Sequence, residues 1–371
     1  MVGGATERAH GPGRSPPLLD LLGTSFEFNT DIEALAWHGD APCLGFANGT
    51  VALIASNWPG GPSVVPRRGG GVAITAGDAP PPPPRIHAAH EGAVIAMAAE
   101  STGSVISGGA DGRLMHIADD RLEPLAERPR RRIALVAAGR PGHRAFACGR
   151  QVHLLGTDTR RVDASGPVRA LAYDGSGLHL AIAEESRVLH LTSGARRVRT
   201  LDDSIGCATG PGALAWSPSG DAIAFRDPAG GVHVSDPGGR RALRHVPDER
   251  GAASISFTAD GILAVAAGDS VRFWRLTGDE IAAAGEADAG AQIVALAAHP
   301  RLPVLAAGMD DGAIRVLHPL MPGSLAIRDD GAGIVHLAFS GDGTALAFAD
   351  AAREAGALGL PDALFRTGVT G

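Results

Sequence analysis

One short pattern recurs at a nearly constant interval, and it restricts the possible folds more than any other feature of the chain. Each copy is an apolar segment, a polar turn that often contains glycine, and a second apolar segment. The four clearest copies begin about 41 residues apart, at Leu214, Ile255, Leu296 and Leu337. This interval is typical of a four-stranded propeller blade, so the repeat predicts an all-β propeller.

Weaker copies of the pattern extend the repeat toward the N-terminus. They begin at Leu35, Met97, Val136 and Leu171. Eight units predict a single propeller of eight four-stranded blades, with seven blades as the alternative if the third or fourth unit is irregular. The apolar segments are short and alternate with period two, as in Val271–Leu276, which is the signature of strands. We therefore expect even the Ala- and Glu-rich stretch Gly278–Ala289 to be a loop and an outer strand.

The repeat also sets the domain boundaries. Residues 1–23 are predicted to be a disordered N-terminal tail, residues 24–361 the propeller, and residues 362–371 a C-terminal tail. Residues 56–85 interrupt the pattern and are rich in proline and glycine. Since proline cannot donate to a strand ladder, this insertion is expected to be an extended excursion from the first blade. A docking site for a proline-recognising partner is an alternative interpretation.

The second unit carries the most specific motif. It has His90 before its first strand, Ser107 in its second strand and Asp111 in the following turn. This arrangement resembles the WD-repeat family, in which these three types of residue and a tryptophan form a buried hydrogen-bonded set. Ile117 stands where the tryptophan is usual, and the other units are more degenerate. The resemblance implies a structural role for His90, Ser107 and Asp111, and implies that an N-terminal strand near Ser25–Asn29 completes the last blade.

Composition and charge exclude several classes of function. The formal net charge is -7, which argues against a general nucleic-acid binder, because such proteins need a basic surface. All 33 basic residues are arginine, which we interpret as the imprint of a GC-rich bacterial genome. The N-terminus lacks the pattern of a secretory signal, and no apolar run reaches the length of a membrane-spanning helix. A cytoplasmic protein without membrane contact is therefore expected.

No catalytic or metal-binding motif is evident. Phosphate-binding loops, nucleophile elbows and clusters of metal ligands are missing from the sequence, so no catalytic, cofactor-binding or metal-binding residue is predicted. The three cysteines, Cys43, Cys148 and Cys207, are too far apart in sequence to suggest a metal site or a redox pair, and we interpret them as buried thiols. Histidines fall in or near the first strands of three units, at His38, His299 and His336. These are interpreted as structural or exposed.

Charged residues in the turns suggest two opposite faces. In a propeller, the turns between the second and third strands open on the same face as the connections between blades. On this face we predict an acidic interaction surface containing Asp31, Glu91, Asp310, Asp311, Asp329 and Asp330. The same face holds arginines that partly offset it, Arg131, Arg132, Arg150, Arg187 and Arg250. The opposite face is predicted to be basic, with Arg160, Arg161, Arg196, Arg197, Arg240 and Arg241.

These observations favour a non-catalytic scaffold for protein–protein interaction. The scaffold is expected to be monomeric and to bind one or more proteins, with a basic partner region on the acidic face. The alternative is an enzyme, or a binder of a metal or small ligand, that uses the central channel. Such a site would need polar residues that converge from the inner strands, which are mostly Ala, Leu and Val. A periplasmic propeller is a third interpretation, disfavoured by the lack of a signal peptide.

Overall fold

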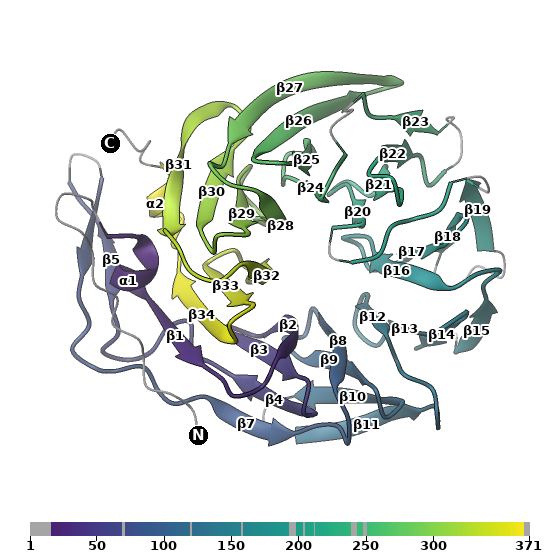
Figure 1. Cartoon of the computed structure of the whole chain (residues 1–371), viewed down its shortest axis with the longest axis horizontal. Coiled ribbons are helices and arrows are strands. Elements are labelled where there is room, and N and C mark those ends of the chain that lie inside the picture. Colours follow the sequence, from purple (N-terminus) through teal and green to yellow (C-terminus); the bar gives the residue numbers. More distant parts are fainter. Residues whose placement is uncertain are drawn as a thin grey trace.

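Eight four-stranded antiparallel sheets surround a central axis in the computed structural model (Figure 1). The structure describes residues 16–68, 71–118, 121–156, 159–192, 198–202, 205–210, 212–238, 243–247 and 251–366. Each sheet is one blade, and we number the blades 1 to 8 in the chain order of their innermost strands. In blades 2 to 7 the four strands follow each other in chain order from the axis to the rim. The prediction of an all-β propeller with eight blades is therefore confirmed, and the seven-blade alternative is wrong.

The innermost strands of neighbouring blades contact one another and form a closed ring. They are β2 (Ile32–His38), β8 (Val94–Ala99), β12 (Leu135–Ala138), β16 (Val168–Tyr173), β20 (Leu214–Trp216), β24 (Ser254–Phe257), β28 (Ile293–Ala298) and β32 (Ile334–Phe339). Each of these strands contains the first residue of one predicted unit. The apolar pattern of the sequence thus located the inner strand of every blade.

The remaining strands complete the blades toward the rim. The second strands are β3 (Ala41–Phe46), β9 (Val105–Gly109), β13 (Arg144–Cys148), β17 (His179–Glu184), β21 (Ile223–Arg226), β25 (Leu263–Ala267), β29 (Leu305–Met309) and β33 (Ala345–Asp350). The third strands are β4 (Thr50–Leu53), β10 (Arg113–Ala118), β14 (Gln151–Leu155), β18 (Val188–Thr192), β22 (Val232–Ser235), β26 (Ser270–Thr277), β30 (Ile314–His318) and β34 (Glu354–Gly359). The outer strands are β7 (Arg85–Ala88), β11 (Arg121–Glu127), β15 (Arg160–Asp163), β19 (Val198–Asp202), β23 (Arg244–His245), β27 (Glu280–Asp288), β31 (Met321–Arg328) and β1 (Gly23–Glu27).

The core lies between the faces of neighbouring blades. Between blades 5 and 6, for example, Val234 packs in one apolar cluster with Phe257 and Val265. The second strands are therefore buried along most of their length, and β25 is buried at every residue. Their many alanines suit this position, because small side chains let two sheets approach closely. The outer strand β27, where the helix-like composition was interpreted as a strand, mostly faces solvent.

Two faces of the disc are made by different connections. We call the first the b–c face, because it contains the turns between second and third strands together with the connections from one blade to the next. Backbone hydrogen bonds join these two kinds of loop, as from Ala89 to the carbonyl of Gly49 (3.1 Å) and from Ala289 to that of Asp269 (2.8 Å). The opposite a–b face contains the remaining turns. Blade-to-blade connections are thus anchored on the b–c face.

The ring is closed by a strand from the N-terminus. β1 pairs with β34 of blade 8, with Ser25 opposite Gly356, and so becomes the outer strand of the last blade. The structure places this strand two residues earlier than the predicted Ser25–Asn29 and otherwise confirms the closure. Pairing the first strand with the last blade removes an open sheet edge, which would otherwise be free to pair with another chain.

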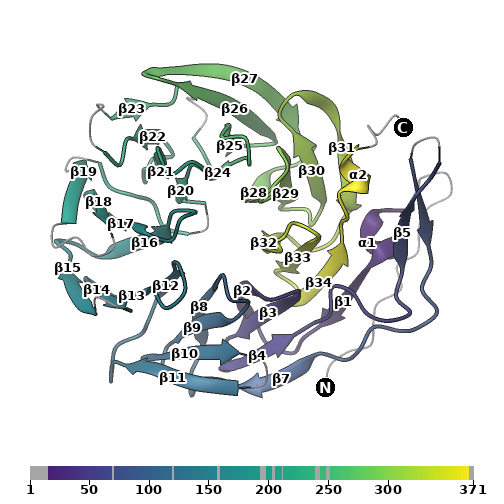
Figure 2. The ribbon, with the colours of Figure 1, turned by 180° about the vertical axis from the view of Figure 1, so that it is seen from behind.

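The proline-rich insertion is more ordered than the sequence suggested. Between β4 and β7 it forms a hairpin of β5 (Ser63–Pro66) and β6 (Val72–Thr75). The hairpin packs its Val64 and Ile74 against the apolar cluster of blades 7 and 8, in which Leu19 is buried. Figures 1 and 2 show it beside the N-terminal helix, on the far side of β1 from its own blade. The insertion is thus an excursion from the first blade, and it contains a hairpin that the sequence did not suggest.

Short helices lie inside both predicted tails. α1 (Leu18–Leu22) buries Leu18, Leu19 and Leu22, and α2 (Ala363–Arg366) buries Leu364. The propeller domain therefore extends beyond the predicted boundaries at residues 24 and 361. Residues 1–15 and 367–371 lie outside the described residues. Neither helix, nor any other in the described chain, has the length and hydropathy needed to cross a membrane.

Candidate binding surfaces

The structure brings together the three residues that the family resemblance singled out in blade 2. His90 Nε2 lies 2.9 Å from Ser107 Oγ, and His90 Nδ1 lies 3.1 Å from Asp111 Oδ1. A carboxylate can only accept, so Nδ1 carries the proton and Nε2 accepts from the Ser107 hydroxyl. We call these residues the histidine set. It ties the connection that enters blade 2 to the b–c turn of the same blade.

The surroundings of the histidine set keep its ring neutral and its carboxylate charged. Burial lowers the pKa of His90, although Asp111 opposes this shift. Burial works against ionisation of Asp111, but hydrogen bonds from the backbone N–H groups of Arg113 and Glu91 and from His90 hold its pKa below the usual value. Gly109 makes room for the set, because a Cβ there would overlap the His90 ring and the Asp111 carboxylate. The arrangement is structural and leaves no group free for chemistry.

A second polar set, which the sequence did not suggest, joins blades 7 and 8. Arg328 is only 1% exposed, and its Nη2 donates to Asp350 Oδ2 (2.8 Å) and to Glu354 Oε2 (2.7 Å). The guanidinium also lies over the Phe348 ring, 4.9 Å from its centroid. We call Arg328, Asp350 and Glu354 the arginine set. Asp350 and Glu354 lie 22 and 26 residues after Arg328 in the sequence, so no short motif reveals the set.

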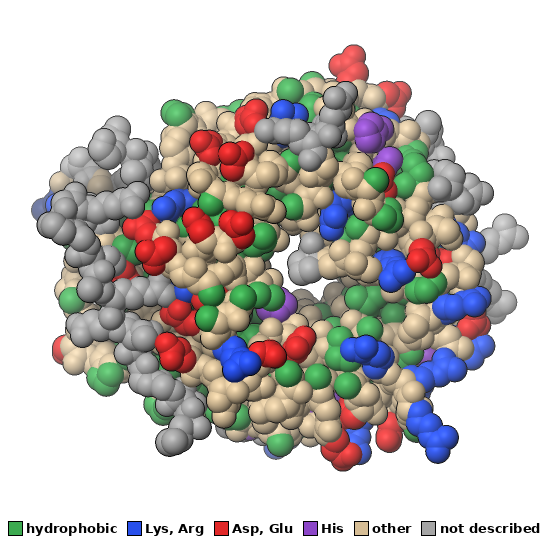
Figure 3. All heavy atoms as spheres, in the orientation of Figure 1, with side chains coloured by type: hydrophobic (Ala, Val, Ile, Leu, Met, Phe, Trp, Pro, Cys, Tyr) green, Lys and Arg blue, Asp and Glu red, His purple; other side chains and the backbone are tan. Residues whose placement is uncertain are grey.

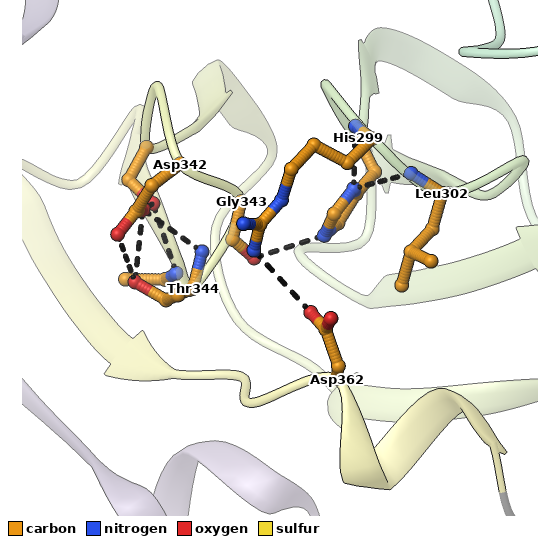
Figure 4. Close-up of polar contacts among 9 residues, drawn as sticks. His299, Leu302, Asp342, Gly343, Thr344 and Asp362 are labelled. Atoms are coloured by element: carbon orange, nitrogen blue, oxygen red, sulfur yellow. Dashed lines mark hydrogen bonds and ion pairs between the residues drawn. The ribbon is translucent and has the colours of Figure 1, made fainter.

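His299 is the best-buried histidine on the a–b face. Figure 4 shows that its ring lies between the turns of blades 7 and 8, near α2. Nδ1 accepts from the backbone N–H of Leu302 (2.9 Å), and Nε2 lies 2.9 Å from the carbonyl oxygen of Gly343. Since Nδ1 accepts, the proton is on Nε2, and burial lowers the pKa of the ring. With both nitrogens engaged by backbone groups, His299 is a structural residue.

The described residues contain no cluster of His, Cys, Asp or Glu that could hold a metal ion. All three cysteines are buried. Burial raises the pKa of Cys43 and of Cys207 to about 12, so neither thiol is an effective nucleophile near neutral pH. We therefore consider the exposed surfaces of the ring as candidate binding sites.

At the mouth of the central channel, several inner strands turn a side chain outward. The pairing register shifts near the start of five inner strands, at Glu33, Ile95, Arg169, Val294 and Val335. Such bulges re-aim side chains. Val294 and Val335 are 38% and 42% exposed in consequence. Both lie at the end of the inner strand that faces the b–c face, where hydrophobic side chains border the central opening in Figure 3.

The channel itself is lined mainly by small apolar residues. A pocket of about 410 Å³ lies within it, and the charged or titratable residues that line this pocket are Glu33, Arg169 and His336. Arg169 donates to Glu185 (2.7 Å) and is thereby engaged. Burial lowers the pKa of the His336 ring, although the nearby backbone of Ile32 and Glu33 opposes this shift. His336 Nε2 is buried without a hydrogen-bond partner among the described residues.

The predicted acidic residues are all on the b–c face, and they fall into two groups. Some are neutralised by arginines: Asp31 pairs with Arg353 (2.7 Å), Glu91 with Arg113 (2.9 Å) and Asp329 with Arg315 (2.9 Å). Asp310 and Asp311 are exposed at the b–c turn of blade 7, and no described cation pairs with either. Asp330 is also exposed in the next connection.

Five arginines converge on a cleft of about 810 Å³ between blades 2 and 3. Arg130, Arg131 and Arg132 come from the connection between the blades, Arg150 from the b–c turn of blade 3, and Arg161 from its outer strand β15. Asp163 is the one acidic residue in the lining. The run of three arginines was visible in the sequence, but its convergence with two other elements was not.

This cleft corrects the prediction of an opposite basic face. Arg161 was assigned to that face, yet it lines the same cleft as arginines of the b–c face. Its neighbour Arg160 is half-buried in β15. The other predicted members, Arg196, Arg197, Arg240 and Arg241, lie outside the described residues. Figure 3 shows both charges on one face: acidic side chains gather over the blades that contain β26–β34, and basic ones predominate over those that contain β12–β19. Charge is separated by sector of the ring.

Comparison with known proteins supports the fold and nothing finer. No family model matches the sequence, and no curated protein matches it. Among solved structures, the crystal structure of the computationally designed Ika8 protein is similar, with a TM-score of 0.66 and 18% sequence identity. The match covers 90% of this chain and 97% of that one. At this identity the similarity demonstrates the propeller fold alone.

Proposed function

We propose that this protein is a non-catalytic platform for protein–protein interaction, which binds a segment of its partner at the channel mouth on the b–c face. The observation that carries the proposal is the pair of bulges in blades 7 and 8, which turn Val294 and Val335 into solvent. Aliphatic side chains held outward by strand geometry have no role in the core. They offer a partner apolar area on a rigid frame.

The charges beside this apolar area indicate the partner's chemistry. Asp310 and Asp311 stand at the b–c turn of blade 7, exposed and without a described cationic partner. Interfaces commonly combine an apolar centre with a charged rim, and complementary charge speeds encounter and fixes register. The proposed partner segment therefore presents aliphatic residues to Val294 and Val335 and basic residues to the aspartates.

The resemblance to WD-repeat proteins supports the same function. The geometry of the histidine set agrees with the hydrogen-bonded set of that family, and such propellers serve widely as interaction platforms. Fold and family resemblance are analogies, so the proposal depends on the exposed residues themselves.

The test replaces the two valines by charged residues. The full-length protein and its Val294→Glu, Val335→Glu variant are used to capture partners from an extract of the source cells, and the captured proteins are quantified by mass spectrometry. We expect at least one partner to be retained by the wild type and lost by the variant. That partner is then purified and titrated against both proteins by calorimetry.

A matched control keeps the outcome specific. Leu320 and Met321 lie on the a–b face of blade 7, and they are 60% and 54% exposed. A Leu320→Glu, Met321→Glu variant should bind the partner as the wild type does. If the two variants lose the same partner equally, or neither loses it, the channel mouth is not the binding surface.

A small polar ligand in the channel is the second candidate function, and one observation favours it. His336 Nε2 is buried and has no described partner, and a bound ligand could supply one. Full-length protein and a His336→Leu variant, incubated with a metabolite extract, would be compared by mass spectrometry of bound small molecules. A compound bound by the wild type alone would support this candidate.

A further inference from the structure

The geometry points to a second binding site, on the rim: the arginine cleft between blades 2 and 3 binds an acidic peptide segment. This inference rests on the proposed function, because it names a further part of a partner protein. It concerns a different place on the ring, however. The cleft is lined by Arg130, Arg131, Arg132, Arg150 and Arg161.

Charge imbalance is the first argument. Among the described residues of the lining, Asp163 is the one carboxylate, and Arg161 already pairs with it (2.9 Å). Within the described chain, Arg130, Arg131, Arg132 and Arg150 form no ion pair.

Other arginines on the b–c face, two of them half-buried, behave differently. Arg113, Arg169 and Arg353 each pair with a carboxylate of their own chain. The cleft therefore concentrates positive charge that the protein itself leaves uncompensated, and a carboxylate-bearing ligand would relieve the mutual repulsion.

Preorganisation is the second argument. The connection that carries the arginines is fixed by backbone hydrogen bonds, from Arg131 to the Arg128 carbonyl (3.1 Å) and from Ile133 to the Gly109 carbonyl (3.0 Å). Gly112, with a φ of 82°, lets this backbone approach, because a Cβ there would overlap the carbonyl oxygens of Arg128 and Arg131.

Arg130 itself adopts a positive φ of 63°, a conformation that a residue with a side chain adopts only when its surroundings impose it. Two residues earlier in the chain, the guanidinium of Arg128 lies 5.5 Å from the Phe146 ring centroid and contacts His153. A loop fixed in this way loses little entropy when it binds, and so more of the interaction energy appears as affinity.

The shape and lining of the cleft select the class of ligand. All five arginines are exposed, so the cleft is an open trough and not the enclosed pocket that buries most of a small molecule. No aromatic residue lines it, whereas single-stranded nucleic acid is usually held by stacking on aromatic side chains. An extended segment with several Asp or Glu residues fits both features.

Fluorescence anisotropy of the full-length protein tests this inference. The probe is a fluorescein-labelled peptide of alternating Glu and Gly, compared with a Lys–Gly peptide of the same length and with an oligothymidylate of the same charge as the Glu peptide. We expect saturable binding of the Glu peptide that weakens with salt, and much weaker binding of the other two. Equal or tighter binding of the oligothymidylate would overturn the assignment in favour of nucleic acid.

Paired variants locate the site. Arg132 and Arg150 are exposed, and their side chains make no hydrogen bond to a described residue, so Arg132→Ala with Arg150→Ala should preserve the fold. We expect the Glu peptide to bind this variant about tenfold or more weakly, since two charge-assisted contacts are lost. Lysines at both positions should restore part of the affinity, because charge returns without the bidentate geometry.

A control variant separates local from general charge. Arg121 and Arg275 are also exposed, but they lie on other strands outside the cleft. Their double alanine variant should bind the Glu peptide as the wild type does, and an equal loss in both variants would disprove a localised site. If the wild type captures a partner through the channel-mouth valines but does not bind the Glu peptide, the cleft alone is rejected. If the wild type binds the Glu peptide through the cleft arginines but the valine substitutions leave partner capture unchanged, the channel mouth alone is rejected.

Discussion

Two polar sets hold different parts of the ring together, and they do so by different physics. The histidine set of blade 2 is a relay of a hydroxyl, a neutral ring and a carboxylate, within one blade and its entry connection. The arginine set places a guanidinium between two carboxylates at the junction of blades 7 and 8. One is a hydrogen-bond relay beside the surface, and the other is a buried ionic cluster.

The difference predicts how each part fails. Removing one member of a hydrogen-bond relay leaves a polar atom unsatisfied, which costs a moderate amount of stability. Removing the cation of a buried ionic cluster leaves negative charges without compensation in a poorly solvated site, which costs more. The junction of blades 7 and 8 therefore depends more strongly on a single side chain than blade 2 does.

The largest effect is expected at Arg328. An Arg328→Met variant keeps most of the apolar stem but leaves Asp350 and Glu354 without their cation, so we expect a loss of about 3–5 kcal/mol in the free energy of unfolding. Urea denaturation monitored by circular dichroism measures it. Arg353→Ala is the control, in the turn between Asp350 and Glu354, because its pair with Asp31 is exposed and should contribute about 1 kcal/mol or less.

A compensated variant sharpens this test. Adding Asp350→Asn and Glu354→Gln to Arg328→Met removes the uncompensated charge. Asp350 Oδ1 also accepts from the backbone N–H groups of Ala352 and Glu354, and an asparagine retains this acceptor. Most of the lost stability should return. If the triple variant is no more stable than Arg328→Met, packing and not charge is the reason for the loss.

An intermediate effect is expected in the histidine set. Ser107→Ala removes the donor to His90 Nε2, which is then buried without a partner, so we expect a loss of about 1–3 kcal/mol. In a double-mutant cycle with His90→Leu, the combined loss should be smaller than the sum of the single losses. Ser101→Ala, at an exposed position, should change little. Additive losses would mean that the two side chains do not interact.

The smallest effect should appear as a dependence on pH. Burial lowers the pKa of His90 and that of His299 from the usual value of 6.5. Between the lowered and the usual pKa, the unfolded chain binds more protons than the native protein, so stability falls as the pH drops through this window. Urea denaturation at a series of pH values should show a shallower slope for His90→Leu, and an unchanged slope would contradict this origin.

Much of the fold could be predicted from the sequence because it is local and repeated. The interval of about 41 residues reflects a unit of four short strands, and its copies located all eight inner strands. The three residues of the histidine set could be found for the same reason, since their spacing within one blade is fixed by strand and turn lengths.

Features that depend on contacts between distant segments could not be predicted in this way. The five leucine-rich residues of α1 are too short to signal a helix, and only packing against blades 7 and 8 makes them one. The prolines of the insertion obscured the apolar pattern of its two short strands. In the structure Val64 and Ile74 lie opposite each other in the hairpin and are half-buried. The arginine cleft draws on three separate elements, and charge placement by turn type alone put Arg161 on the wrong face.

Ring closure by β1 has a consequence for how the chain folds during its synthesis on the ribosome. The first strand to emerge finds its partner, β34, only after more than three hundred further residues have been made. At about 5–20 residues per second, that is a wait of roughly a quarter of a minute to a minute. Throughout this time Phe26 and three leucines of α1, Leu18, Leu19 and Leu22, all buried in the finished ring, are exposed to other nascent chains. A circular permutant that places residues 16–28 after α2 would end that wait.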